Sequence, residues 1–162
     1  MIVADAGPLI AFSRIGRLDL LRQVVGELVI PEAVYDDVVA KGKGRVGADQ
    51  VERAQWIRRL AIADPRALAH LPPDLGRGER EAIALAKAEG AQLVVDDRRA
   101  RTVAQEAGIE VFGTLRILAE AKRRGFVAEV RPIVQELRAV GYWMHEERLL
   151  RPFLRGIGEE PI

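Results

Sequence analysis

The stretch IVADAGP at residues 2–8 decides the fold, because it has the pattern of a strand, a turn and the start of a helix. Its apolar run, residues 2–4, ends at Asp5. Gly7 can cap a helix whose first position is Pro8, where the fixed backbone of proline suits a helix start. The stretch therefore predicts a strand that leads directly into a helix, with Asp5 at the carboxyl end of the strand.

The same pattern recurs along the chain. Amphipathic helical stretches, including one predicted over 51–60, alternate with short strand-like runs at 28–30, 93–95 and 109–112 and a further short run at 61–63. Alternating strands and helices form βαβ units, which build a parallel sheet covered on both faces. We therefore expect a three-layer α/β/α fold around a mostly parallel sheet of four to five strands.

Length and composition limit the class of protein. The chain has 162 residues, 49% of them hydrophobic and 30% charged, which is typical of one globular domain. No linker divides it, so we predict a single domain over residues 1–162, with about 126–162 as a C-terminal helical extension and tail. Met1 leads into the first strand without the basic and apolar segments of a signal peptide, which favours a cytoplasmic location.

The absence of cysteine excludes disulfides, thiolate zinc sites and a cysteine nucleophile. With only two histidines, a multi-histidine metal site is also disfavoured. A bound metal would therefore be held by carboxylate oxygens, and such ligands favour Mg²⁺ or Mn²⁺.

Acidic residues follow two of the predicted strands. Asp5 follows the first, and Asp96 and Asp97 follow the run at 93–95. In a parallel α/β sheet the carboxyl ends of the strands meet at one edge, where ligands bind. One of the adjacent pair can cap the next helix, but a single side chain is enough for that purpose. At least one acid of this pair is therefore a candidate ligand.

Two predicted helices add further acids. On the helix that begins at Pro31, Asp36 and Asp37 border the apolar face on opposite sides, so helical geometry does not choose between them. Glu79 is in line with the buried stripe of its own helix, whereas Glu81 falls away from it. Glu79 can also complement the positive end of that helix, which is the competing structural explanation.

These acids come from separate βα units, and their convergence would cause strong repulsion unless a cation or a proton compensated it. One or two divalent ions would supply that compensation. Bound there, they could also activate a water for attack on a phosphodiester and stabilise the departing oxygen. The sequence therefore favours metal-dependent phosphodiester hydrolysis without a covalent nucleophile.

Taken together, these stretches resemble the PIN-domain family, in particular a small prokaryotic branch similar to the toxin ribonucleases of toxin–antitoxin pairs. The order and spacing of the motifs carry the resemblance, which covers about residues 1 to 140. The matching stretches are 3–10, 29–39, 78–86, 93–99 and 113–115 with the helix that follows.

The resemblance implies four catalytic acids. The first falls on Asp5; the second falls best on Asp37, where Glu is usual. The third falls on Glu79, where Asp is more common. The fourth falls on Asp97, with Asp96 as its close rival. We therefore expect Asp5, Glu79, Asp97 and Asp96 to hold Mg²⁺ or Mn²⁺.

Gly7 departs from the family, which often has a hydroxyl or amide residue two positions after the first acid. Ser13 and Thr114 are the alternative sources of such a polar contact.

The resemblance also implies RNA as the substrate, an antitoxin protein as a partner and a homodimer. Arg98, Arg99 and Arg101 follow the fourth acid and are candidates for neutralising phosphates, as are the cations at 122–124. Aromatic residues make up only 5% of the chain, so the sequence gives little support for a base-stacking platform. The main rival is a PIN-like module that binds nucleic acid or protein with weak or no cleavage. A phosphotransfer receiver is disfavoured, because no second acid follows Asp5 two residues on.

Overall fold

The computed structural model describes all 162 residues. Its elements are β1 (Ile2–Ala4), α1 (Ala6–Arg14), α2 (Leu18–Val25), β2 (Leu28–Ile30), α3 (Glu32–Tyr35), the π-helical η1 (Asp36–Ala40), α4 (Ala48–Arg53), β3 (Ile57–Arg59), the 3₁₀ helix η2 (Pro65–His70), α5 (Arg77–Glu89), β4 (Gln92–Val94), α6 (Arg98–Glu106), β5 (Val111–Phe112), α7 (Thr114–Arg123), α8 (Arg131–Ala139), the π-helical η3 (Glu146–Leu150) and α9 (Arg151–Gly156). No helix has the length and apolar character needed to cross a membrane.

The five strands form one parallel sheet in the order β3-β2-β1-β4-β5. Helices flank the sheet, so the predicted PIN-like α/β/α class with a parallel sheet is confirmed. From β1 the chain continues to β2 on one side, whereas from β4 it continues to β5 on the other. The two central strands, β1 and β4, therefore form the point where the strand order reverses, and ligands of open α/β sheets bind beyond the carboxyl ends of such strands.

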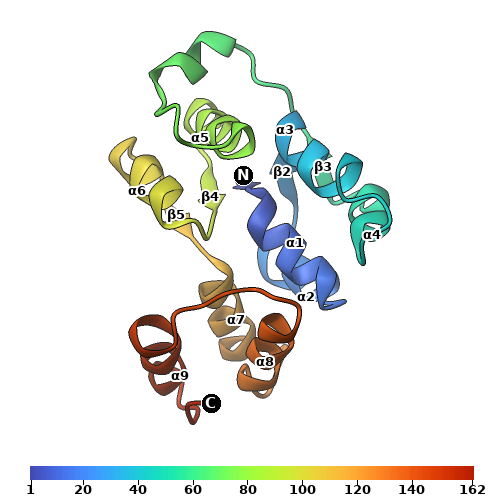
Figure 1. Cartoon of the computed structure of the whole chain (residues 1–162), viewed down its shortest axis with the longest axis vertical. Helices are drawn as coiled ribbons and strands as arrows, with labels where there is room; N and C mark the ends of the chain where they lie inside the picture. The colour runs from blue at the N-terminus through green and yellow to red at the C-terminus, as the bar shows by residue number, and fades with distance from the viewer.

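One continuous apolar core of 40 buried residues runs through the sheet and the helices, including α8 and α9. Val3, Leu93 and Val94 of the two central strands have no exposed surface. Figure 1 shows α7, α8 and α9 gathered at one end of the molecule, with the segment between α8 and α9 crossing toward the α/β part. This crossing segment, residues 140–145, is called the strap below.

Two sequence predictions between residues 48 and 63 are wrong. The predicted helix at 51–60 is the short helix α4, which ends at Arg53, followed by β3; the predicted strand at 61–63 is not a strand. The strand is Ile57–Arg59, at the edge of the sheet beside β2. Because one side of an edge strand faces water, Arg58 and Arg59 are exposed, and their charges hid the strand pattern.

Two helix starts also differ from expectation. Helix α1 begins at Ala6, so Asp5 occupies the position before the helix, and Gly7 and Pro8 lie within its first turn. A proline is tolerated there because the first amides of a helix have no intrahelical acceptor. The sequence pattern predicts the next long helix from Glu79, but helix α5 begins two residues earlier, at Arg77, which makes Glu79 its third residue.

Candidate functional site

Asp5 lies at the carboxyl end of β1, against the neighbouring strand. Its amide donates a hydrogen bond of 2.9 Å to the carbonyl of Val94 in β4. Although Asp5 precedes α1, its side chain makes no capping hydrogen bond, and the residue is only 7% exposed. Capping therefore does not explain this buried acid.

The charges of three other acids raise the pKa of Asp5. Burial raises its pKa to about 7, the amide of Ala6 opposes the rise, and the negative charges of Glu79, Asp37 and Asp96 add to it. Coulombic effects of this kind require short separations. The fold thus brings four carboxylates from four separate chain segments to one place beyond β1 and β4.

The start of α5 lies against Asp37 and Asp5. A β-carbon placed on Gly78 would be 2.8 Å from Oδ2 of Asp37 and 3.9 Å from Oδ1 of Asp5. The two carboxylates therefore lie close to the same point of the helix backbone. Only a glycine leaves room for the Asp37 carboxylate in this position.

The choice between Asp36 and Asp37, which helical geometry left open, is visible in their contacts. Asp36 accepts a hydrogen bond of 3.3 Å from Arg77 at the surface. Asp37 lies against Gly78, and its other oxygen accepts a hydrogen bond of 3.0 Å from Lys41. The backbone changes from α to π at Asp36, which alters the spacing of side chains around the helix.

Glu79 and Glu81 also differ in the groups that they contact. Oε2 of Glu79 accepts a hydrogen bond of 3.0 Å from the amide of Gly76, and the negative charge of Glu79 raises the pKa of Asp5. Glu81 instead contacts α3, where it accepts a hydrogen bond of 3.2 Å from the amide of Ala33. Glu79 therefore both stabilises the start of its helix and belongs to the acidic cluster.

The adjacent acids after β4 have different contacts. Asp97 caps α6, accepting a hydrogen bond of 2.8 Å from the amide of Ala100, and is exposed. Asp96 accepts hydrogen bonds from the amide and the hydroxyl of Thr114, at 2.8 and 2.6 Å, and from the hydroxyl of Tyr142. Of these two residues, only Asp96 contributes to the pKa shift of Asp5.

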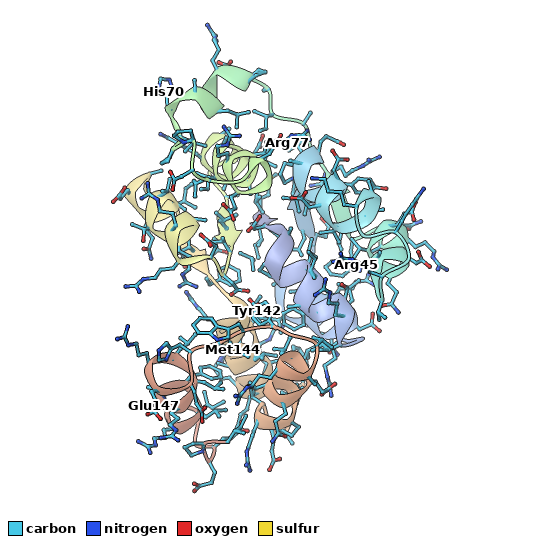
Figure 2. All side chains as sticks on the ribbon, in the orientation of Figure 1. Arg45, His70, Arg77, Tyr142, Met144 and Glu147 are labelled. Carbon is cyan, nitrogen blue, oxygen red and sulfur yellow. The ribbon has the colours of Figure 1, made fainter.

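Tyr142 connects the strap to the site. Figure 2 places this residue where the C-terminal helices meet the α/β part. Burial raises the pKa of the Tyr142 hydroxyl, and the charge of Asp96 raises it further. The hydroxyl therefore remains protonated and donates its hydrogen to Asp96.

The four clustered acids, Asp5, Asp37, Glu79 and Asp96, are hard oxygen donors and suit Mg²⁺ or Mn²⁺ chemically. As they lie in this structure, no three Asp, Glu or His side chains are positioned to hold a metal ion together. In this arrangement Asp37 accepts a hydrogen bond from Lys41, and Glu79 accepts one from the Gly76 amide.

The predicted phosphate-binding arginines differ in their surroundings. Arg98 is exposed, and Arg99 forms an ion pair of 3.1 Å with Asp74. Arg101 is half-buried beside Asp96, since a β-carbon on Gly113 would touch the Asp96 carboxylate and lie 2.8 Å from Nη1 of Arg101. The cations at the end of α7 bind other groups of the protein: Lys122 pairs with Glu159 at 2.9 Å and Arg123 with Glu120.

Sequence reasoning missed Gly78, Gly113 and Tyr142 as neighbours of the acids. A glycine directly before the predicted helix start at Glu79 was a signal of close approach that could have identified Gly78. Tyr142 gave no such signal, because it is 46 residues from Asp96 in the chain. Of the two suggested hydroxyls, Thr114 contacts the site, whereas the Ser13 hydroxyl donates to the carbonyl of Ile10 within α1.

Comparison with known proteins identifies the family. The solved structure of a PilT N-terminus domain protein from the hyperthermophilic archaeon Sulfolobus solfataricus P2 is similar over 91% of this chain and 100% of that one, with 17% identity and a TM-score of 0.48. No curated protein matches the sequence. A family model described as a PIN domain matches residues 1–159. The chain therefore belongs to the PIN-domain family, and its fold is of the nuclease type.

Proposed function

We propose that this PIN domain is a ribonuclease that hydrolyses phosphodiester bonds with Mg²⁺ or Mn²⁺ held by Asp5, Asp37, Glu79 and Asp96. One observation carries the proposal: Asp5 is buried among three other acids, which helps to raise its pKa to about 7. A divalent cation is the natural partner for such a cluster, because it removes the repulsion that the fold creates.

A divalent ion held by these four acids would supply Lewis-acid chemistry for the phosphate and for a water nucleophile. The chain's own contribution is the placement of the ligands. Thr114 and Tyr142 fix the orientation of Asp96 through its hydrogen bonds. Asp37 and Glu79 stand at the exposed side, where Lys41 and the Gly76 amide occupy them until an ion competes. The choice of Asp96 over Asp97 as the ligand is part of the proposal.

A basic cavity beside Asp37 supports a nucleic-acid substrate. Its volume is about 110 Å³, and its lining includes Arg14, Lys41 and Arg45 next to Asp37. Cations adjacent to an acidic centre can hold phosphates on either side of the bond to be cut. Arg101, beside Asp96, offers a further positive charge across the cluster. The preference for RNA, the toxin role, an antitoxin partner and a homodimer rest on the family resemblance alone.

A second candidate is a PIN module that binds nucleic acid or protein with weak or no cleavage. The observation in its favour is that no three acidic side chains are positioned for an ion as they lie here. In this case the bonds from Lys41 to Asp37 and from Gly76 to Glu79 would persist when metal is added.

Cleavage of single-stranded RNA in the presence of Mn²⁺ separates the two candidates. The wild-type protein should cut the RNA, EDTA should stop it, and Asp5→Asn should abolish it. The matched control is Asp49→Asn, an exposed acid of α4 paired with Arg53, which should cut like the wild type. RNA binding without metal-dependent cleavage by the wild type would instead support the binding module.

A further inference from the structure

The strap carries an exposed aromatic side chain next to Tyr142, the residue that contacts Asp96 of the acidic cluster. Trp143 is 79% exposed and directly follows Tyr142, whose hydroxyl donates to Asp96. Consecutive Cα atoms are about 3.8 Å apart. Trp143 therefore lies beside a residue that touches the proposed catalytic acids.

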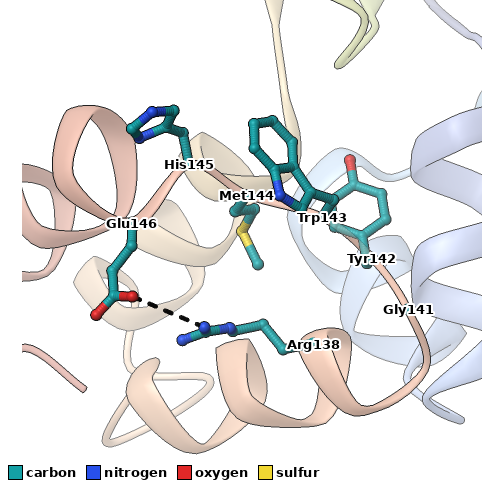
Figure 3. A pocket seen from close by; sticks show the side chains of 7 residues that line it. All are labelled: Arg138, Gly141, Tyr142, Trp143, Met144, His145 and Glu146. Carbon is teal, nitrogen blue, oxygen red and sulfur yellow. Dashed lines mark ion pairs between the residues drawn. The ribbon is translucent and has the colours of Figure 1, made fainter.

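Trp143 is one of seven residues that line a cavity of about 340 Å³. Figure 3 shows its lining: Trp143 stands at the rim, Met144 points inward, and the ion pair between Arg138 and Glu146 lies below. The volume is at the lower end of the range of about 300–1,000 Å³ for small-molecule sites. It therefore suits a ligand group of modest size rather than a folded domain.

Local contacts stabilise the position of the indole ring. His145 lies edge-on to Trp143, with ring centroids 5.9 Å apart and planes at 78°. The His145 ring is itself fixed, since its Nδ1 accepts a hydrogen bond of 3.2 Å from the amide of Arg148. Gly141, with a φ of +88°, makes the turn by which the strap leaves α8. An exposed tryptophan held in this way offers a flat face at low entropic cost.

We propose that Trp143 forms a nucleobase-stacking subsite, which holds a base of the single-stranded RNA whose backbone lies on the acidic cluster. Stacking on aromatic side chains is the common way in which proteins hold unpaired bases. The proposal rests on the proposed function for its substrate, and it supplies a stacking residue for which the sequence alone gave little support.

The surroundings favour a base over a protein partner. Trp143 is the only large exposed apolar side chain in the lining, while Met144 is buried and the other residues include Arg138, His145 and Glu146. A stable protein interface buries about 800 Å² on each partner around an apolar centre. A single indole among charged groups therefore suits a nucleobase on a phosphate backbone better than it suits a protein interface.

Binding measurements in the Asp5→Asn background, which prevents cleavage, test the subsite. Trp143→Ala should weaken the binding of a short oligoadenylate by about five- to a hundredfold, and Trp143→Phe should weaken it less. An abasic strand of the same length should lose less than about twofold, because it has no base to stack. The control Phe126→Ala removes another exposed aromatic, which follows the C-terminal end of α7 and contacts Arg124, and should change neither affinity.

Tryptophan fluorescence gives a second readout. The chain has two tryptophans, and Trp56 is only 9% exposed, so quenching by oligoadenylate should come from Trp143. Equal binding by Trp143→Ala and its parent, or an equal loss for the abasic strand, would overturn the subsite. If Trp143→Ala disrupts self-association and leaves RNA binding intact, the strap is a protein contact and the proposal is wrong.

The failure of the subsite and the failure of the proposed function are distinguishable. Wild-type protein that cuts RNA, with Trp143→Ala showing unchanged affinity, removes the subsite and keeps the nuclease. Base-dependent binding through Trp143, with no metal-dependent cleavage by the wild type, removes the nuclease and keeps the subsite.

Discussion

Asp5 and Asp96 follow neighbouring parallel strands at the same edge of the sheet, yet their surroundings differ. Asp96 is held by the amide and hydroxyl of Thr114 and by Tyr142. Asp5 is more buried, and the Ala6 amide is the only group that lowers its pKa. The Asp96 carboxylate is thus held by three hydrogen-bond donors, whereas only the Ala6 amide favours the charged form of Asp5. Under the proposed function, Asp5 is therefore the acid whose charge a cation would stabilise most.

The largest expected effect concerns the pair of acids after β4. Asp96→Asn should reduce metal-dependent RNA cleavage by at least about a hundredfold, since losing even an indirect contact to a metal ligand costs ten- to a hundredfold. Asp97→Asn should have little effect, because Asn caps a helix as well as Asp does. Cleavage rates at saturating Mn²⁺ provide the measurement. Greater loss in Asp97→Asn would reverse the assignment of the two residues.

The pH dependence of stability sharpens the description of Asp5. Its folded-state pKa of about 7 exceeds the unfolded value of 3.8, so the folded state binds more protons between these values. Stability of the metal-free protein should therefore fall as pH rises from about 4 to 7, and Asp5→Asn should gain about 2–3 kcal/mol over wild type at pH 8. Urea unfolding at pH 4.5 and pH 8 measures this. An equal effect of the substitution at both pH values would show that the pKa of Asp5 is not raised in the folded protein.

A substitution at Gly78, in the first turn of helix α5, should displace the carboxylate of Asp37 next to Asp5. Gly78→Ala would place a methyl group 2.8 Å from Oδ2 of Asp37, so the carboxylate must move. We expect cleavage to fall by about tenfold or more, as for displaced metal ligands, with the fold retained. The matched control is Gly76→Ala, whose β-carbon meets only Glu79 at an ordinary 3.8 Å. Equal activities of the two variants would remove Asp37 from the site.

The smallest effect tests the support of Asp96. Tyr142→Phe removes one donor and leaves both Thr114 hydrogen bonds, so stability should fall by about 1–2 kcal/mol. Tyr35→Phe is the control, because it changes the chain's other tyrosine, whose ring packs against the Arg59 guanidinium. Thermal unfolding of both variants gives the comparison. If Tyr142→Phe is as stable as wild type, the strap contributes nothing to the orientation of Asp96.

The fold could be predicted well from local pattern, and the contacts of the site only in part. The apolar runs around Val3, Val29 and Leu93 gave three buried strands, because central strands of a parallel sheet are apolar on both faces. The edge strand at Ile57–Arg59 was not predicted, because its exposed side chains are charged. For the acids, the ends of the predicted strands were enough to place Asp5 and the pair Asp96 and Asp97 at the correct edge of the sheet.

The remaining choices depended on tertiary contacts that sequence spacing does not contain. Asp36 and Asp37 have different contacts because a π-helical turn begins at Asp36 and because Gly78, on helix α5, lies against the Asp37 carboxylate. Asp96 is distinguished from Asp97 by Tyr142, which reaches it from the strap between α8 and α9.

Anomalous scattering from a crystal of the wild-type protein soaked in Mn²⁺ tests the central claim most directly. The account predicts a manganese peak between Asp5 and Asp96, with Asp37 and Glu79 turned away from Lys41 and the Gly76 amide toward the ion. A fully soaked crystal with no peak beside Asp5, or with manganese bound at Asp97 on the exposed side of α6, would contradict it.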